Sequence, residues 1–399
     1  MANLHIIELL FILLISWYLG RLFRHKLDMP PMLGELLAGL IFGPSLLNLV
    51  QPNEYISFLA ELGIFFLMFY AGTETDPKAF FKSMKPSILC GILGFIIPLI
   101  LGYYGSKIFM PSLTEFQAIF IGLGLSITAI AVNARILMDL NMQQSRIGHV
   151  LIGAALVDDI LSLGVFSALV DTIQSGNTAA EISLQSLYPV FSSMAHVALF
   201  FLLTYGIGKL VLPLLNRFYN EEGHGFTFSL LTAFIFAYIA EAMGLHLIIG
   251  AFIAGLFVRE ELNDKMVLSL LNDRLMVISY GFLGPVFFVS LAFHVDLIGL
   301  LHNLPFLTLI LVVAVFGKFT GSYIGCILSG LKKSEGVVVS AGMNGRGAVE
   351  LILVSVGVEL GILTPEIVTV LVSMAFITTF MTPIAFKKLL THYRGQKLL

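Results

Sequence analysis

Long apolar segments dominate this sequence and restrict the folds open to it. The hydrocarbon core of a bilayer is about 30 Å thick, and about 20 apolar helical residues cross it. Thirteen segments match this pattern, although the ninth is short: 4–23, 32–50, 56–74, 86–109, 115–139, 145–172, 187–215, 226–243, 245–258, 267–293, 301–330, 334–360 and 364–390. Since 58% of the residues are hydrophobic and only 12% are charged, a soluble fold could not hide this apolar surface. We therefore predict an all-α integral membrane protein with about 13 transmembrane helices.

Basic residues give the expected orientation of these helices. The cytoplasmic loops of membrane proteins carry an excess of Lys and Arg. Of the 22 Lys and Arg residues, all but Lys107, Lys318 and Arg346 lie at or near odd-numbered membrane exits, a group that includes Arg135. This pattern places the amino terminus outside and the carboxyl terminus, with a tail over 392–399, in the cytoplasm. Lys318 and Arg346 fall well inside expected helices and need a separate explanation.

A short internal match indicates two halves of opposite orientation. Residues 34–42 read GELLAGLIF and residues 250–258 read GAFIAGLFV, so that Gly, Ala, Gly and Leu coincide. The two copies lie seven segments apart, and an odd offset inverts one copy across the membrane. A nine-residue match can also arise by chance in a sequence rich in Leu and Gly. The interpretation is a first six-helix repeat, with dimerisation and core helices, over 1–172, a linker helix within 173–225 and a second, inverted six-helix repeat over 226–391.

Small and polar residues interrupt two expected helices at equivalent places in the two halves. The fifth segment carries FIGLGLSITAIAVN over 120–133, and the twelfth carries SAGMNGRGAVE over 340–350. In inverted repeats, broken helices of this kind meet near the middle of the membrane and form the transport site. Irregular backbone is tolerated there only if it is buried or lines a cavity. The alternative is that these residues only allow close helix packing, which is how we interpret Gly317, Gly321 and Gly325 in the eleventh segment.

Two neighbouring acids lie at the centre of the sixth segment. Asp158 and Asp159 interrupt the apolar run GAALVDDILSL, and a charge at the bilayer centre costs at least about 2.5–3.5 kcal/mol. Adjacent residues of a helix point about 100° apart, so the two carboxylates are expected to face different partners. An intramembrane acid indicates an ion or proton pathway. A surface kink or a structural ion pair is the alternative.

Lys318 is the expected partner of one of these acids. It lies near the middle of the eleventh segment, too far from either end for its ammonium group to reach the membrane surface. Burial favours release of a lysine proton, and a nearby carboxylate opposes that release. Such a site can bind either a metal cation or protons, which is what a proton-coupled exchanger requires. A purely structural counter-ion is the alternative.

Other charged residues of the expected helices have plainer interpretations. Arg346 and Glu350 have the i, i+4 spacing that allows an ion pair along one helix face, with either a structural or a transport role. Four further acids are expected to make helix-to-helix hydrogen bonds or gate contacts: Glu35 and Glu74 near helix ends, and Glu61 and Glu241 embedded in helices. The two cysteines and nine histidines show no spacing typical of a metal site, and we expect no cofactor.

These motifs resemble the monovalent cation:proton antiporter-2 family, in particular its NapA-like sodium/proton antiporters. The similar stretches are LSITAIAVNARIL in the fifth segment, GAALVDDILSL in the sixth, FGKFTG in the eleventh, GMNGRGAVELIL in the twelfth and YAGTETDP at the end of the third. The resemblance covers nearly the whole chain. It implies a NapA/NhaA-like fold with inverted repeats and two crossing broken helices.

The resemblance also implies roles for individual residues. Asp159 would bind the cation with help from Thr128, while Asp158 would pair with Lys318. The residues expected to support this site are Ser126, Asn133, Asn344, Arg346 and Glu350. The resemblance further implies a homodimer, in which a six-helix core moves like an elevator against a dimerisation scaffold, and electrogenic exchange.

Two features differ from the family pattern. Relatives of the potassium-efflux type carry a soluble nucleotide-binding regulatory domain after the last helix, whereas this sequence runs only to Leu399 after a short basic tail. We therefore do not expect nucleotide gating. Asn344 and Gly345 stand where relatives often carry other residues, which leaves the choice between Na+ and K+ open.

A secondary antiporter is the function that the sequence predicts best. We expect alternating-access exchange of a monovalent alkali cation, Na+ first and otherwise Li+ or K+, for H+ in a bacterial plasma membrane, with no nucleic-acid partner. A K+/H+ exchanger or a K+ efflux system without its regulatory domain is the alternative. A channel would gain nothing from a titrating Asp and Lys cluster. An intramembrane aspartyl protease needs two acids facing one water, whereas Asp158 and Asp159 are neighbours on one helix, so an enzyme is not expected.

Overall fold

The structure is a computed structural model and is built from helices in the residues that it describes, which are 2–174, 188–210, 224–262, 265–295, 299 and 303–396. Nine helices in this part of the chain are long and apolar enough to cross a membrane, and three shorter apolar helices accompany them. Each of the thirteen expected segments carries a helix. The all-helical prediction is confirmed, whereas the number of crossings and the inverted repeat stay predictions.

The chain forms its helices in the following order. They are α1 (Ala2–Lys26), α2 (Met32–Phe42), α3 (Glu54–Glu74), α4 (Pro77–Lys82), α5 (Met84–Phe109), α6 (Glu115–Ser126), α7 (Ile130–Asp139), α8 (Arg146–Gln174), α9 (Tyr188–Leu210), α11 (His224–Ala242), α12 (Leu247–Glu261), α13 (Lys265–Ile278), α14 (Gly284–Leu291), α16 (Leu304–Leu328), α17 (Lys333–Gly342), α18 (Ala348–Glu359) and α19 (Pro365–Gly395). A π-helical turn, η2 (Ser279–Leu283), joins α13 to α14, and a short 3-10 turn, η3 (Ala292–His294), follows α14.

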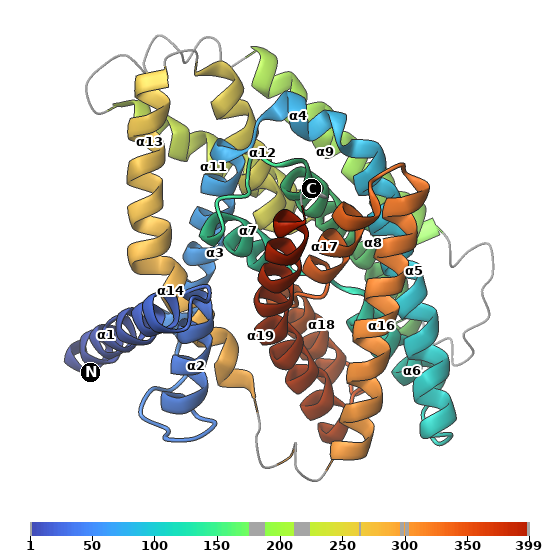
Figure 1. The fold of residues 1–399 in the computed structure, drawn as a ribbon. Coiled ribbons are helices and arrows are strands. Elements are labelled where there is room, and N and C mark those ends of the chain that lie inside the picture. Colours follow the sequence, from blue (N-terminus) through green and yellow to red (C-terminus); the bar gives the residue numbers. More distant parts are fainter. Residues whose placement is uncertain are drawn as a thin grey trace.

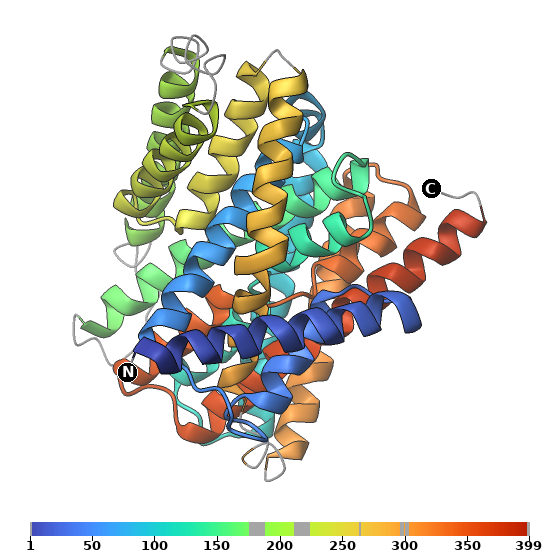
Figure 2. The same cartoon turned by 90° about the vertical axis from the view of Figure 1, so that its left-hand side faces the viewer.

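The helices pack into two bodies, which lie to the left and the right in Figure 1 and are seen from the side in Figure 2. We call the first the scaffold; it contains α1, α2, α3, α11, α12, α13 and α14. The second, the core, contains α5, α6, α8, α16, α17, α18 and α19. The α7 helix continues the core chain beyond α6 and packs against both α3 and α8. It therefore forms part of the boundary between the two bodies.

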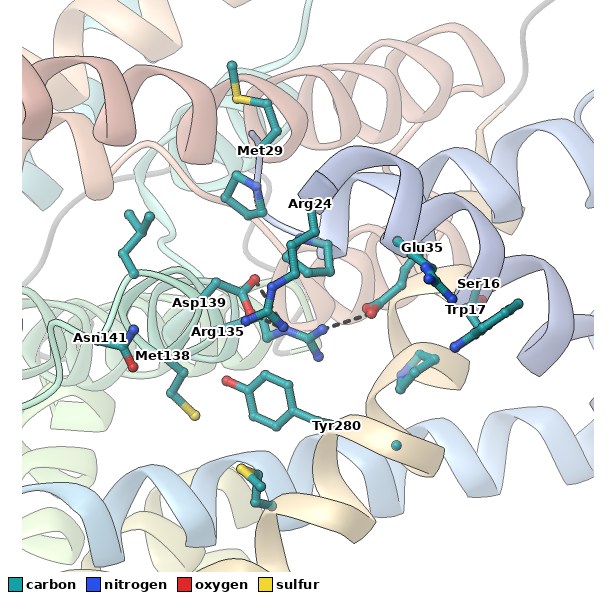
Figure 3. Close-up of a pocket in the computed structure, with 18 of the residues that line it drawn as sticks. Ser16, Trp17, Arg24, Met29, Glu35, Arg135, Met138, Asp139, Asn141 and Tyr280 are labelled. Atoms are coloured by element: carbon teal, nitrogen blue, oxygen red, sulfur yellow. Dashed lines mark hydrogen bonds and ion pairs between the residues drawn. The ribbon is translucent and has the colours of Figure 1, made fainter. Parts of the chain in front are cut away.

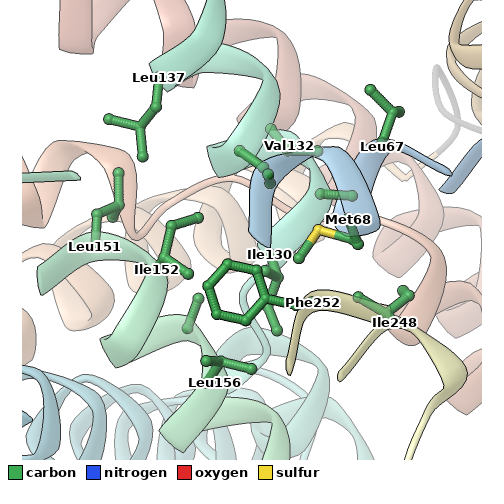
Figure 4. Close-up of a cluster of buried hydrophobic side chains, with 14 of the residues drawn as sticks. Leu67, Met68, Ile130, Val132, Leu137, Leu151, Ile152, Leu156, Ile248 and Phe252 are labelled. Atoms are coloured by element: carbon green, nitrogen blue, oxygen red, sulfur yellow. The ribbon is translucent and has the colours of Figure 1, made fainter. Parts of the chain in front are cut away.

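An apolar layer fills part of this boundary (Figure 4). Phe252 of α12 is fully buried beside side chains from α3, α7 and α8. The residues around it include Leu67, Met68, Ile130, Val132, Ile152, Leu156 and Ile248. Side chains packed at interior density leave few voids large enough for water. The layer therefore keeps water out of this part of the boundary.

Glycines on α16 allow this helix to approach α5 closely. A Cβ atom at Gly321 would lie 2.2 Å from the carbonyl oxygen of Leu93, and one at Gly325 would lie 2.2 Å from that of Leu89. Contacts this short exclude a larger residue unless the backbone moves. The prediction that these glycines serve helix packing is confirmed. The same close approach buries Lys318 completely inside the core.

Two expected helices differ from the structure in extent or continuity, and a third is described only in part. The segment expected over 32–50 is helical only to Phe42, because Gly43 and Pro44 end the helix and the chain folds back on itself. The segment expected as one helix over 267–293 is divided by η2, a wider turn that an apolar pattern does not reveal. Of the linker helix expected over 187–215, the structure describes α9, and the rest of that segment lies outside the described residues.

Candidate ion-binding site

Two interrupted helices meet inside the core. Short non-helical segments separate α6 from α7 and α17 from α18. The N–H of Ala129, in the first break, donates to the carbonyl oxygen of Gly345 in the second at 2.9 Å. The hydroxyl of Thr128 likewise donates to the carbonyl oxygen of Met343 at 3.0 Å. The predicted meeting of the two breaks is therefore confirmed, and the contacts hold them together.

The two neighbouring acids of α8 have different surroundings. Asp158 is 0% exposed and accepts a hydrogen bond from Lys318, with an Oδ1–Nζ distance of 2.7 Å. Asp159 is 1% exposed, and its Oδ1 has no hydrogen-bond partner among the described residues. The structure thus separates a paired acid from an unpaired one, as the angle of about 100° between adjacent helical side chains requires.

Two buried basic side chains bind the carbonyl oxygens at the end of α6. The last four carbonyls of a helix have no partner within that helix and carry a partial negative charge. Lys318 donates to the carbonyl of Ser126. Arg346 binds the carbonyls of Gly124, Leu125 and Ile127, at 2.7, 2.5 and 2.6 Å. Arg346 and Lys318 therefore act as side-chain caps that stabilise the break.

The expected ion pair between Arg346 and Glu350 is not formed, which corrects the sequence prediction. Arg346 precedes the first residue of α18, so the i, i+4 geometry of a helix does not apply to this pair. Its guanidinium turns to the carbonyls of α6 instead. Both carboxylate oxygens of Glu350 are buried without a hydrogen-bond partner in the described part of the chain. Glu350 lies in the first turn of α18, where the helix dipole favours a negative charge.

The remaining predicted residues surround the breaks in different ways. The Ser126 hydroxyl donates back to Gly122 at 2.8 Å, so that only its carbonyl reaches Lys318. Both polar side-chain atoms of Asn133 are buried without a partner within the described residues. Asn344 donates to Ser340 at 3.1 Å, and its Oδ1 is unpartnered. The amide oxygens of Asn133 and Asn344 are therefore free to accept a cation or a proton donor.

A cavity between the two bodies does not reach these acids. It has a volume of about 860 Å³ and opens between the scaffold and α7 (Figure 3). Glu35, Arg135 and Asp139 line it, whereas Asp158 and Asp159 do not. Asp158 and Asp159 are 0% and 1% exposed, so solvent does not reach either acid in this structure.

Arg135 has ionic contacts that its position near the end of α7 does not reveal. Its side chain is only 2% exposed and pairs with Glu35 and Asp139. The i, i+4 spacing of Arg135 and Asp139 was a usable signal for this pair. Glu35 lies a hundred positions away in the chain, and no spacing pattern could identify it as a partner.

The other acids give mixed outcomes. The helix-to-helix contacts expected of Glu35 and Glu74 are confirmed, because Glu35 accepts from Arg135 and Glu74 accepts from Asn272. Glu61 and Glu241 lie within α3 and α11, as expected, and both are exposed, so the contacts expected of them stay predictions.

Comparisons with known proteins agree with this fold. The family described as "Sodium/hydrogen exchanger, transmembrane" matches residues 9–392, and the chain belongs to this family of membrane transporters. A Na(+)/H(+) antiporter from Enterococcus hirae is 28% identical over 381 residues, which cover 96% of this chain and 97% of the relative. The probable Na(+)/H(+) antiporter GerT from Bacillus cereus is 30% identical over 381 residues, which cover 96% of this chain and 98% of that protein.

A solved structure shows the same fold. The sodium proton antiporter MjNhaP1 from Methanocaldococcus jannaschii at pH 8 superposes with a TM-score of 0.71 at 17% identity, covering 98% of this chain and 97% of that one. The predicted antiporter-like helical fold of an integral membrane protein is therefore confirmed.

Proposed function

We propose that the protein is a secondary antiporter that exchanges Na+ for H+ by alternating access. The observation that carries the proposal is Asp159, a buried carboxylate in a membrane helix whose Oδ1 has no hydrogen-bond partner among the described residues. Such a group is costly as a bare anion. Either a proton or an alkali cation can neutralise it, and each ligand excludes the other. Competition at Asp159 is therefore sufficient to couple the two fluxes.

Oxygen atoms around the helix breaks are suited to complete the cation site. Asp158 Oδ2, Asn133 Oδ1 and Asn344 Oδ1 are buried and accept no hydrogen bond from any residue that the structure describes. We assign these oxygens and the Thr128 hydroxyl as the atoms that can coordinate the cation together with Asp159. Carboxylate, amide and hydroxyl oxygens are the ligands that hard cations prefer. Ser126 and Arg346 support the site through the contacts that hold the end of α6 in place, and Glu350 adds a buried carboxylate in the first turn of α18.

Lys318 supplies a second proton-binding group. Its ammonium group bridges Asp158 and the carbonyl of Ser126. When an incoming cation attracts Asp158, Lys318 loses its counter-ion and releases its proton. Exchange that moves net charge responds to membrane potential by about 2.3 kcal/mol per charge for each 100 mV. Exchange that ignores a valinomycin-clamped potential would contradict this part of the proposal.

The division into core and scaffold suggests how access alternates. The acids, both helix breaks and Lys318 belong to the core or its continuation in α7, so movement of the core against the scaffold would carry the site across the membrane. We propose that the end bearing the basic residues of α1 and α19 faces the cytoplasm of a bacterial cell, with the amino terminus outside. We also propose a homodimer, which light scattering of the detergent-purified protein would test against a monomer.

Inside-out vesicles provide the main test of antiport. Addition of Na+ should dissipate an imposed proton gradient in vesicles with the natural protein and should have no effect with Asp159→Asn. Glu115→Gln is the matched control, because it also removes one carboxylate but at an exposed site paired with Lys107. An Asp159→Asn protein that is inserted, folded and fully active would remove Asp159 from the site.

The transported cation is the open part of this proposal. Carboxylate and amide oxygens accept both Na+ and K+, so a K+/H+ exchanger is the second candidate. Competition among Li+, Na+, K+ and Rb+ in the vesicle assay distinguishes them. Dissipation by Na+ and Li+ alone supports the first candidate, and a larger response to K+ supports the second.

A further inference from the structure

A second buried ionic cluster joins the core to the scaffold (Figure 3). Arg135 of α7 lies with Nη2 2.7 Å from Glu35 Oε1 of α2, and the two side chains are 2% and 5% exposed. Its Nε lies 3.3 Å from Asp139 Oδ1, one helical turn further along α7. One guanidinium group is therefore bound at the same time to a carboxylate of its own helix and to a carboxylate of the opposite body.

Aromatic rings of the scaffold hold the same guanidinium group. Arg135 Cζ lies 4.1 Å from the centre of the Tyr280 ring and 5.5 Å from that of Phe288, within the range of cation–π attraction. Tyr280 belongs to the π-helical turn η2, and turns of this kind are frequent at functional sites. A Cβ atom on Gly284, just after that turn, would lie 3.3 Å from Arg135 Nη1. Tyr280, Phe288 and Gly284 of the scaffold thus pack closely around the Arg135 guanidinium group.

The cluster lines the cavity of Figure 3, and a second ion pair between the bodies lies at the same cavity. Lys387 of α19 pairs with Asp28, which lies in the loop between α1 and α2. The distance from Lys387 Nζ to Asp28 Oδ2 is 2.7 Å. Both residues also line the cavity of about 860 Å³. Water in such a space can solvate charges that separate, which lowers the cost of breaking the pairs.

We propose that Glu35, Arg135 and Tyr280 form a latch between scaffold and core, which must open in each transport cycle. The inference rests on the proposed function, because it requires movement of the core against the scaffold. Arg135 cannot keep its bonds to Glu35 and Tyr280 if α7 moves with the core. The Asp158–Lys318 pair differs from the latch because both of its residues belong to one body and can move together. The latch joins two bodies and lies beside the cavity.

Covalent closure of the latch is the direct test. In a Cys90→Ala, Cys326→Ala background, Glu35→Cys and Arg135→Cys are joined with a short, reducible bifunctional thiol reagent, and exchange is measured in proteoliposomes. Cross-linking should abolish exchange, and reduction should restore it to the level before cross-linking. The matched control is Lys107→Cys with Glu115→Cys, a pair within the core that should keep its exchange after the same treatment.

The outcomes separate the latch from the antiport proposal. Exchange that survives complete cross-linking, or a pair that cannot be cross-linked, overturns the latch and leaves antiport standing. Absence of exchange in the uncross-linked natural protein instead overturns the proposed function. If the Glu35→Cys, Arg135→Cys protein does not fold, Asp28→Cys with Lys387→Cys gives the same test at the rim of the cavity, with the same expected loss and recovery.

Discussion

The two buried ionic clusters of this molecule contain similar groups in contrasting surroundings. At the helix crossing, Asp158 and Lys318 belong to one body and pair at 2.7 Å, while Asp159 Oδ1 has no partner in the described part of the chain. At the boundary, Glu35 and Arg135 belong to different bodies, pair at the same distance and line a cavity of about 860 Å³. An unpaired acid inside one body is suited to exchanging ligands. A pair across two bodies is suited to controlling their movement.

The largest expected difference concerns transport activity. Asp159→Asn should reduce exchange to background, because an amide cannot alternate between a proton and a cation. Glu35→Gln should keep measurable exchange, because the latch is weakened while the ion site is intact. Both are measured as Na+-dependent proton flux in vesicles containing equal amounts of folded protein. If both variants lost the same share of the proton flux, the two clusters would not differ in function.

The next expected difference concerns stability. Lys318→Met leaves Asp158 buried without a counter-ion, which should lower the free energy of unfolding by about 3–5 kcal/mol. Arg135→Met should cost less, because the cavity allows water to reach Glu35. Adding Asp158→Asn to Lys318→Met should recover much of the loss. Denaturant unfolding of the detergent-purified variants measures these values, and a larger loss for Arg135→Met would contradict the contrast.

The caps on α6 give a smaller effect. Arg346→Lys keeps the charge but loses the planar fork that reaches several carbonyls at once. An unsatisfied buried acceptor costs about 1–3 kcal/mol, so the break after α6 should open more readily. Amide hydrogen exchange over 124–133 should become faster while exchange over α3 is unchanged. Unaltered protection in both segments would show that the caps are not required.

The smallest effect is expected at the surface. Lys107 and Glu115 lie 2.5 Å apart, but their side chains are 29% and 46% exposed. Exposed pairs of this kind contribute little because water already solvates both charges. Lys107→Ala should change neither the melting temperature nor the exchange rate measurably. A clear loss of either would mean that distance alone, and not burial, decides what an ion pair does in this molecule.

Much of the fold could be predicted from local sequence patterns. Apolar length located the helices, and the small residues around Ser126 and Asn344 located both helix breaks. Intramembrane charge singled out Asp158, Asp159 and Lys318, because a charge in lipid needs a specific reason. The pairing of Asp158 with Lys318 came from the family resemblance, and the structure shows it at 2.7 Å.

The contacts that depend on folding could not be predicted in this way. Which carbonyls Arg346 caps depends on how two broken helices cross, and the i, i+4 spacing to Glu350 indicated a different pair. The position of Arg135 near a membrane exit is typical of any basic residue. Its contacts with Glu35 and Tyr280 exist only because folding brings α2 and η2 beside α7. The π-helical turn could not be predicted from the apolar pattern either, because a wider backbone turn does not change the apolar character of the segment.

The central claim is that a proton and a sodium ion compete for Asp159. The most direct measurement is proton release when Na+ is added to the purified protein in weakly buffered detergent solution. The account predicts release from the natural protein, none from Asp159→Asn, and weaker apparent Na+ affinity as the pH falls. Sodium binding that releases no protons and has the same affinity at every pH would contradict it.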